Sequence, residues 1–159
     1  MTPAFTRAFD IVVGHEGGYT TGKNDPGGET KFGISKRAFP KLDIFSLQLE
    51  DARRIYLSHY WTPIQGDKLP AALGLLMFDA AINNGVAQAT RWLQRAAGVR
   101  VDGALGPATL LAARAPGVDA KFHLERALMM TQLPTWDAFG KGWCIRLATL
   151  PFQALALDD

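Results

Sequence analysis

Apolar residues in the first part of the chain recur at helical spacing and then give way to a different pattern. Over residues 3–16 they return every three or four positions, which predicts a helix that is ended by Gly17 and Gly18. Residues 19–34 are rich in Gly, Thr, Asn, Asp and Pro with aromatic residues between them, a composition typical of a small β-hairpin. The sequence therefore predicts a helix followed directly by a hairpin.

The rest of the chain has the pattern of a helical protein. Ser35 is expected to open a short helical turn, and Ser46 to cap a helix that continues to Trp61. The apolar stretch at residues 69–82 is shorter than the roughly 20 residues that span a bilayer, so we predict a buried central helix over residues 69–84. Four further helices are predicted at residues 86–97, 107–113, 118–132 and 135–150. The predicted fold class is mainly α, with one small β-hairpin.

Composition narrows the classes of function. The chain of 159 residues is long enough for one domain with its own core, and its net charge of +2 is too small to predict a nucleic-acid partner. Cys144 is the only cysteine, which excludes an intramolecular disulfide and a cysteine-based metal site. We expect no metal and no cofactor. Charged residues interrupt residues 1–10 before any apolar run of signal-peptide length, so we expect a protein of the bacterial cytoplasm without its own export signal.

Three polar residues around the first helix and the hairpin predict cleavage of a glycosidic bond. Glu16 is placed at the C-terminal end of the predicted helix, where the helix dipole and apolar neighbours disfavour its anion and suit a general acid. Asp25 and Thr30 lie on the glycine-rich reversal that follows. In an inverting mechanism they would orient and deprotonate a water on the opposite face of the sugar, which requires carboxyl groups roughly 6.5 to 9.5 Å apart. Glu29, on the same hairpin, is the alternative second carboxylate.

The same segments resemble a known family. Residues 15–19 (His-Glu-Gly-Gly-Tyr) and 25–34 (Asp-Pro-Gly-Gly-Glu-Thr-Lys-Phe-Gly-Ile) are similar to the signature of glycoside hydrolase family 108. This is a group of phage and prophage N-acetylmuramidases, some of which are labelled secretion activators. The resemblance implies a lysozyme-like fold and makes Glu16 the catalytic acid. By analogy with phage lysozymes, it gives the remaining catalytic roles to Asp25 and Thr30.

The resemblance extends over nearly the whole chain. Residues 78–85 are similar to the family's central helix, residues 92–95 and 101–109 to its predicted peptidoglycan-binding segment, and residues 139–146 to its terminal helix. We therefore predict one lysozyme-like domain over residues 1–159. It comprises a catalytic lobe, residues 1–85, and a helical lobe, residues 86–159.

Aromatic and amide side chains near the predicted hairpin and central helix are candidate glycan ligands. Aromatic rings offer an apolar face with a polar edge, as sugar recognition requires, and amides can bond to N-acetyl and hydroxyl groups. The predicted substrate-binding residues are Tyr19, Phe32, Tyr60, Asn83 and Asn84. The two asparagines have an alternative role as the cap of the buried helix, and Tyr60 an alternative place in the core. Asp79, inside the apolar helix, is expected to be a paired structural acid.

Together with the resemblance, these residues predict a peptidoglycan hydrolase of the endolysin kind. It would cleave the β-1,4 bond between N-acetylmuramic acid and N-acetylglucosamine as a monomer. It would not insert into the membrane, and it would reach the wall through a separate holin-type pore. Two alternatives stay open. One is a lytic transglycosylase, which needs a single glutamate and leaves Asp25 dispensable; the other is a non-catalytic wall-binding or secretion-assisting protein.

Overall fold

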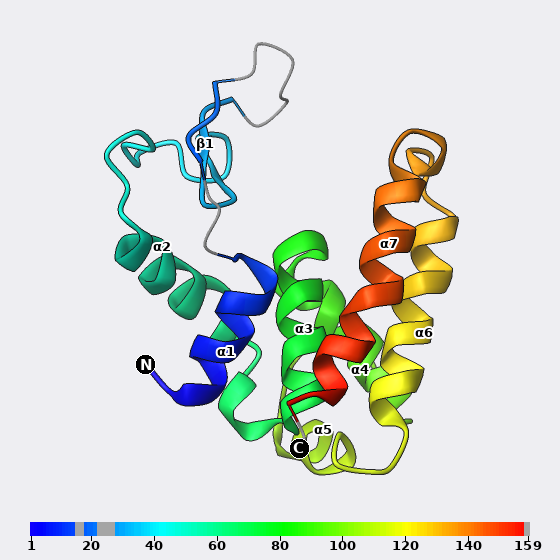
Figure 1. The fold of residues 1–159 in the computed structure, drawn as a ribbon. Coiled ribbons are helices and arrows are strands. Elements are labelled where there is room, and N and C mark those ends of the chain that lie inside the picture. The colour runs from blue at the N-terminus through cyan, green and yellow to red at the C-terminus, as the bar shows by residue number, and fades with distance from the viewer. Residues whose placement is uncertain (15–17, 22–27, 158–159) are drawn as a thin grey trace.

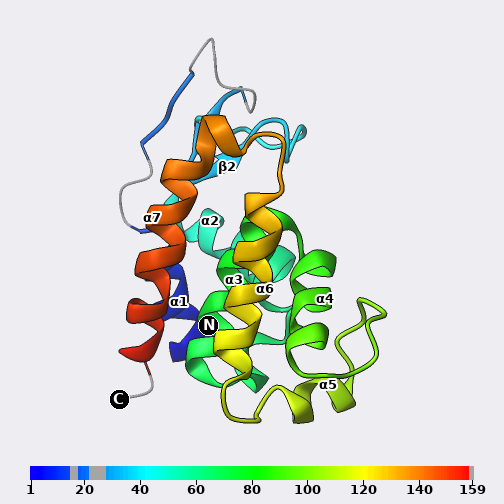
Figure 2. The same cartoon turned by 90° about the vertical axis from the view of Figure 1, so that its right-hand side faces the viewer.

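Seven α-helices and a two-stranded sheet make up the described part of the computed structural model, residues 1–14, 18–21 and 28–157 (Figures 1 and 2). The α-helices are α1 Pro3–Val12, α2 Leu49–Tyr56, α3 Ala71–Asn84, α4 Val86–Ala96, α5 Pro107–Ala112, α6 Val118–Thr131 and α7 Trp136–Leu155. The strands are β1 Thr30–Lys31 and β2 Ile34–Ser35; a π-helix η1 Leu57–Trp61 and a 3₁₀-helix η2 Gly66–Lys68 complete the fold. None of these helices is both long and apolar enough to span a membrane. The prediction of a mainly α fold with one small hairpin is confirmed.

Helix α3 lies at the centre, with the other helices around it (Figure 1). Its residues are buried at every position from 72 to 81, because the helix packs against α1, α4, α6 and α7. A helix that is apolar on all sides is stable only when other elements surround it. The buried central helix predicted from the apolar pattern is therefore present, and it begins at Ala71 rather than at residue 69.

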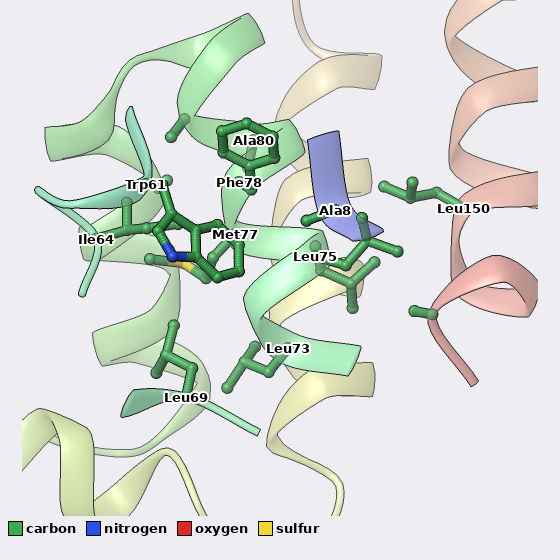
Figure 3. Packing of buried hydrophobic residues seen from close by; sticks show 14 of the residues in the cluster. Ala8, Trp61, Ile64, Leu69, Leu73, Leu75, Met77, Phe78, Ala80 and Leu150 are labelled. Carbon is green, nitrogen blue, oxygen red and sulfur yellow. The ribbon is translucent and has the colours of Figure 1, made fainter. Parts of the chain in front are cut away.

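Aromatic rings fill the core between α1, η1 and α3. The ring of Phe78 lies 5.9 Å from that of Phe5 and 5.5 Å from that of Trp61, in both cases edge to face. Figure 3 shows Trp61 and Phe78 in this packing. Such pairs add about 0.5–1.5 kcal/mol each to the free energy gained from burial. The cluster holds α1 and η1, which flank the hairpin in the sequence, against the central helix.

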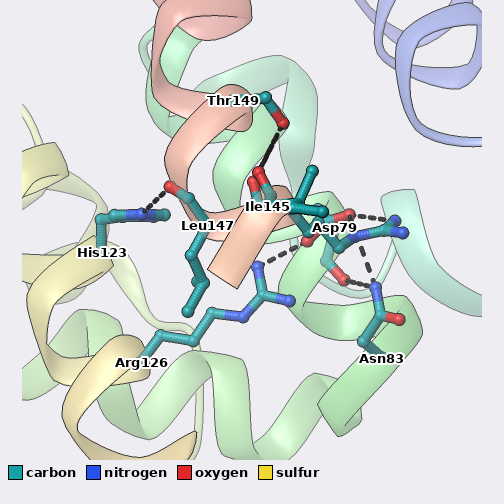
Figure 4. Close-up of polar contacts among 8 residues, drawn as sticks. Asp79, Asn83, His123, Arg126, Ile145, Leu147 and Thr149 are labelled. Carbon is teal, nitrogen blue, oxygen red and sulfur yellow. Dashed lines mark hydrogen bonds and ion pairs between the residues drawn. The ribbon is translucent and has the colours of Figure 1, made fainter. Parts of the chain in front are cut away.

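Asp79 is a charged residue in the buried stretch of α3 and is completely inaccessible to solvent. Its Oδ2 accepts a hydrogen bond of 2.5 Å from Nη1 of the buried Arg126 in α6 (Figure 4). Its Oδ1 accepts a second bond, of 2.7 Å, from Nε of Arg146 in α7. One carboxylate thus joins three helices. The expectation that Asp79 is a paired structural acid is confirmed.

Helix α7 continues past Pro151 to Leu155, whereas the sequence predicted its end at residue 150. Proline has no N–H to donate to the carbonyl four residues earlier, which here belongs to Leu147. Nε2 of His123 in α6 lies 2.7 Å from that carbonyl oxygen and donates the missing hydrogen bond when Nε2 carries the proton (Figure 4). The predicted end was wrong because the replacement donor comes from a different helix.

Two other helix limits differ from the prediction for local reasons. α1 ends at Val12 and not at residue 16, because Gly14 takes a left-handed φ of 70° and already ends the helix before Gly17 and Gly18. α2 begins at Leu49 with Gln48 as its N-cap, not Ser46. The Gln48 N–H donates a 3.1 Å bond to the carboxylate of Asp51 in the first turn.

We predict that Asp79→Asn lowers the free energy of unfolding by about 3–5 kcal/mol, because a neutral amide leaves the buried guanidinium of Arg126 without its counter-charge. Urea denaturation measures the change. Glu125→Gln is the control, since Glu125 pairs with Arg95 on the surface and its loss should cost less than about 1 kcal/mol. Equal losses in the two variants would contradict the role given to Asp79.

Because His123 supplies the hydrogen bond that Pro151 cannot donate, we predict energetic coupling between the two residues. His123→Phe should cost about 1–3 kcal/mol, because it leaves the Leu147 carbonyl without a partner. In the Pro151→Ala background the same change should cost less, since a backbone N–H becomes available to that carbonyl. A double-mutant cycle on the free energy of unfolding measures the coupling. Additive effects would show that the histidine does not replace the helical bond.

Candidate functional site

The strands β1 and β2 are joined by a tight turn and form the hairpin. Thr30 lies opposite Ser35 in the antiparallel register, and a further bridge joins Thr30 to Thr20 through backbone bonds of 2.8 and 3.0 Å. Phe32 and Gly33 form the turn with φ values of 51° and 74°, as a two-residue hairpin requires. The paired strands therefore lie at residues 30–35, toward the end of the segment predicted as a hairpin over residues 19–34. Thr30 is partly buried at the point where both pairings meet.

Tyr56 of α2 attaches this turn to the core. Its hydroxyl donates a 3.0 Å hydrogen bond to the carbonyl of Phe32, and its ring packs edge to face on Phe9 and Phe78. A side chain at Gly33 would meet the tyrosine oxygen, because an added Cβ would lie only 2.6 Å from it. The position of the hairpin turn thus depends on a glycine and a buried tyrosine together.

Tyr19, a predicted substrate ligand, directly precedes Thr20, whose backbone pairs with Thr30. Its ring packs edge to face on Phe45 with centroids 5.1 Å apart. Desolvation raises the pKa of Tyr19 above its usual value, and the charge of Glu29 and a hydrogen bond to that carboxylate raise it further. Glu29, the alternative second carboxylate, therefore has a partner within the hairpin.

Tyr56 and Tyr60 pack together, and the charge of Arg146 in α7 acts on Tyr56. The ring of Tyr60, another predicted ligand, lies 5.5 Å from that of Tyr56. Burial raises the pKa of Tyr56 to about 12, and the positive charge of Arg146 opposes that rise. Arg146 keeps 38% of its side chain exposed while it binds Asp79. Tyr60 belongs to the π-helix η1, and single π-helical turns often occur at functional sites.

The two asparagines at the end of α3 have different surroundings. Nδ2 of Asn83 donates to the backbone oxygen of Asp79 at 2.8 Å and faces its carboxylate at 3.4 Å (Figure 4). Oδ1 of Asn84 is buried and has no hydrogen-bond partner among the described residues. Gly85, with φ 87°, ends the helix directly after them. Asn83 thus belongs to the Asp79 network, and Asn84 keeps an unused acceptor.

Glu16 and Asp25, the two predicted catalytic carboxylates, lie outside the described residues. The described chain places the end of α1 at Val12 on one side of Glu16, and Thr30 after Asp25. Within the described ranges, no group of three or more His, Cys, Asp or Glu residues is arranged to hold a metal ion. Thr30 is therefore the one member of the predicted catalytic set whose surroundings can be described.

The sequence interpretation did not assign partners to Asp79 or a role to Tyr56 at the hairpin. A signal for Arg126 was present, since Phe122, Arg126 and Met130 follow each other at four-residue spacing and all three are buried. An arginine on an apolar helix face needs a buried counter-charge. Arg146 keeps 38% of its side chain exposed, so it does not have to be paired in the same way.

Comparisons with known proteins agree with this arrangement. A family model described as Glycosyl hydrolase 108 matches residues 9–85, and one described as Predicted Peptidoglycan domain matches residues 88–147. Among solved structures, SagA of Brucella abortus is 34% identical, with a TM-score of 0.85. The alignment covers 97% of this chain and 95% of SagA. No match is found among curated protein sequences.

We predict that the stability of the protein falls as the pH rises from about 10 to about 12, in part through Tyr56. In the unfolded chain the tyrosine loses its proton near pH 10, whereas the folded state keeps it until about pH 12, so the folded state is progressively disfavoured in that window. Tyr56→Phe should make the free energy of unfolding less dependent on pH there. Below pH 9 it should cost about 0.5–1.5 kcal/mol for the lost bond to Phe32. An unchanged pH dependence would contradict the raised pKa.

Proposed function

The chain belongs to the glycosyl hydrolase 108 family, and from this membership we propose that it is an N-acetylmuramidase. It would hydrolyse the β-1,4 bond between N-acetylmuramic acid and N-acetylglucosamine in peptidoglycan. The observation that carries the proposal is the family match at residues 9–85, which contains Glu16, Asp25 and Thr30. The adjoining Predicted Peptidoglycan domain at residues 88–147 supports peptidoglycan as the substrate.

In the proposed mechanism, Glu16 protonates the glycosidic oxygen while Asp25 and Thr30 hold and activate a water on the other face of the sugar. Thr30 supports this role because two backbone pairings and the Tyr56 anchor keep its strand in place. A water-orienting hydroxyl must be held within a fraction of an ångström. The paired strand would position that hydroxyl, and inversion at the anomeric carbon is the expected outcome.

The raised pKa expected for Glu16 rests partly on the helix dipole, and the observed end of α1 removes that cause. The helix dipole acts within the last turn, and α1 ends at Val12. A general acid for a sugar leaving group still needs a raised pKa. In the proposed mechanism that rise comes from desolvation by the bound glycan and not from the helix dipole.

Muropeptide analysis of digested sacculi tests the proposal. The wild type should release glycan with reducing N-acetylmuramic acid ends. Glu16→Gln and Asp25→Asn should each lower the rate by about 10²–10⁴-fold, the usual contribution of a general acid or base. Glu29→Gln is the matched control: it removes a carboxylate from the same hairpin, whose partner is Tyr19, and should leave the rate within about tenfold.

Other outcomes would select other functions. Anhydro-muramic ends, with full activity in Asp25→Asn, would identify a lytic transglycosylase. Wild-type protein that binds sacculi without releasing any muropeptide would identify a non-catalytic wall-binding protein. A loss of less than about tenfold in Glu16→Gln, near 1.4 kcal/mol of barrier, is too small for a general acid.

A further inference from the structure

Three aromatic side chains gather at the start of α7. The ring of Trp143 lies 6.0 Å from that of Trp136 and 6.0 Å from that of Phe139, with interplanar angles of 52° and 31°. Phe139 is 57% exposed, and the two tryptophans are half-buried. None of the three packs against the hydrophobic core formed by the described residues. We call Trp136, Phe139 and Trp143 the aromatic platform.

A glycine on the same helix shapes this platform. A Cβ added at Gly140 would lie 2.9 Å from ring carbons of Trp136, so the indole can lie against the helix backbone only because residue 140 has no side chain. The backbone at Gly140 therefore supports one face of the indole. A ligand that stacks on a fixed ring loses less free energy to side-chain ordering than one that must order it.

The platform lies at the same end of the molecule as the hairpin. Figure 1 shows the start of α7 and β1 rising on opposite sides of α3, and Figure 2, turned about the vertical axis, keeps both at that end. Residues 136–143 also fall inside the segment matched by the Predicted Peptidoglycan domain. A linear polymer bound at the hairpin could therefore extend toward α7.

We propose that the aromatic platform is a second binding surface for the glycan strand of peptidoglycan, separate from the hairpin; this rests on the proposed function. Pyranose rings present C–H faces that pack on flat aromatic surfaces, while their hydroxyl groups reach polar neighbours. Exposed Asp137 and Lys141 flank the platform on α7 and supply such neighbours. Their opposite charges do not form the basic cluster that an anionic membrane surface would attract.

Co-sedimentation of the full-length chain with purified sacculi at low temperature tests the proposal. The double variant Trp136→Ala/Phe139→Ala should bind about tenfold more weakly, since each ring contact contributes a few-fold. Gly140→Ala should also weaken binding, because it displaces the Trp136 ring without removing it. Phe152→Ala is the matched control. Phe152 is 76% exposed on the same helix, at its other end, and its removal should leave binding within twofold.

The outcomes separate this proposal from its alternatives. Unchanged binding in the double variant, or an equal loss in Phe152→Ala, would overturn it. So would wild-type binding to phosphatidylglycerol vesicles, but not to sacculi, that the double variant loses. Thermal unfolding checks that each variant is folded, and Phe139→Ala alone, at an exposed position, should still bind a few-fold more weakly. Muropeptide release is measured separately: wild type that binds through the platform without cleaving would refute the proposed function and leave the platform standing.

Discussion

The buried carboxylate of Asp79 is the constraint on which the arrangement of the helices depends. An isolated charge in an apolar interior costs several kcal/mol unless it is paired and hydrogen-bonded. Here the pairing comes from Arg126 on α6 and Arg146 on α7, so both helices must lie against α3 at one register. Such a pair adds little net stability as a whole, but removing one partner is costly because the other charge stays buried without compensation. The exposed part of Arg146 leaves the excess positive charge of the group near solvent.

The two surfaces proposed to bind peptidoglycan are each tied to α3 through a different contact. On one side, Tyr56 packs on Phe78 of α3 and holds the hairpin turn through Phe32. On the other side, Arg146 binds Asp79 and so sets the position of α7, which carries the aromatic platform. His123 adds a second contact between α6 and α7 at the carbonyl left unpaired by Pro151. The position of the platform relative to the hairpin therefore depends on the contacts that each makes with α3.

The sequence was sufficient where local pattern and tertiary packing agree. The apolar stretch at residues 69–82 predicted a buried helix, and Asp79 within it was expected to be paired; both predictions are confirmed. The pattern was insufficient where a distant residue decides the local outcome. Pro151 predicts a helix end unless His123 is known to lie beside Leu147. Ser46 is the better N-cap by residue type, yet Gln48 takes that position, where its N–H bonds to Asp51. From the sequence alone Tyr56 is an ordinary core residue, and its role at the hairpin follows only from the hydrogen bond to the Phe32 carbonyl. The roles of Glu16, Asp25 and Thr30 stay predictions.

Native-state hydrogen exchange of the wild type tests the central claim, that Asp79 joins α6 and α7 to α3 as one cooperative unit, most directly. Amides in α3, α6 and α7 should share the same highest free energy of exchange, because α6 and α7 cannot open without exposing the paired charges. Slow exchange in α1 and α3, with α6 and α7 opening at a much lower free energy, would contradict the account. It would mean that α6 and α7 unfold independently of α3 and that Asp79 does not join them to it.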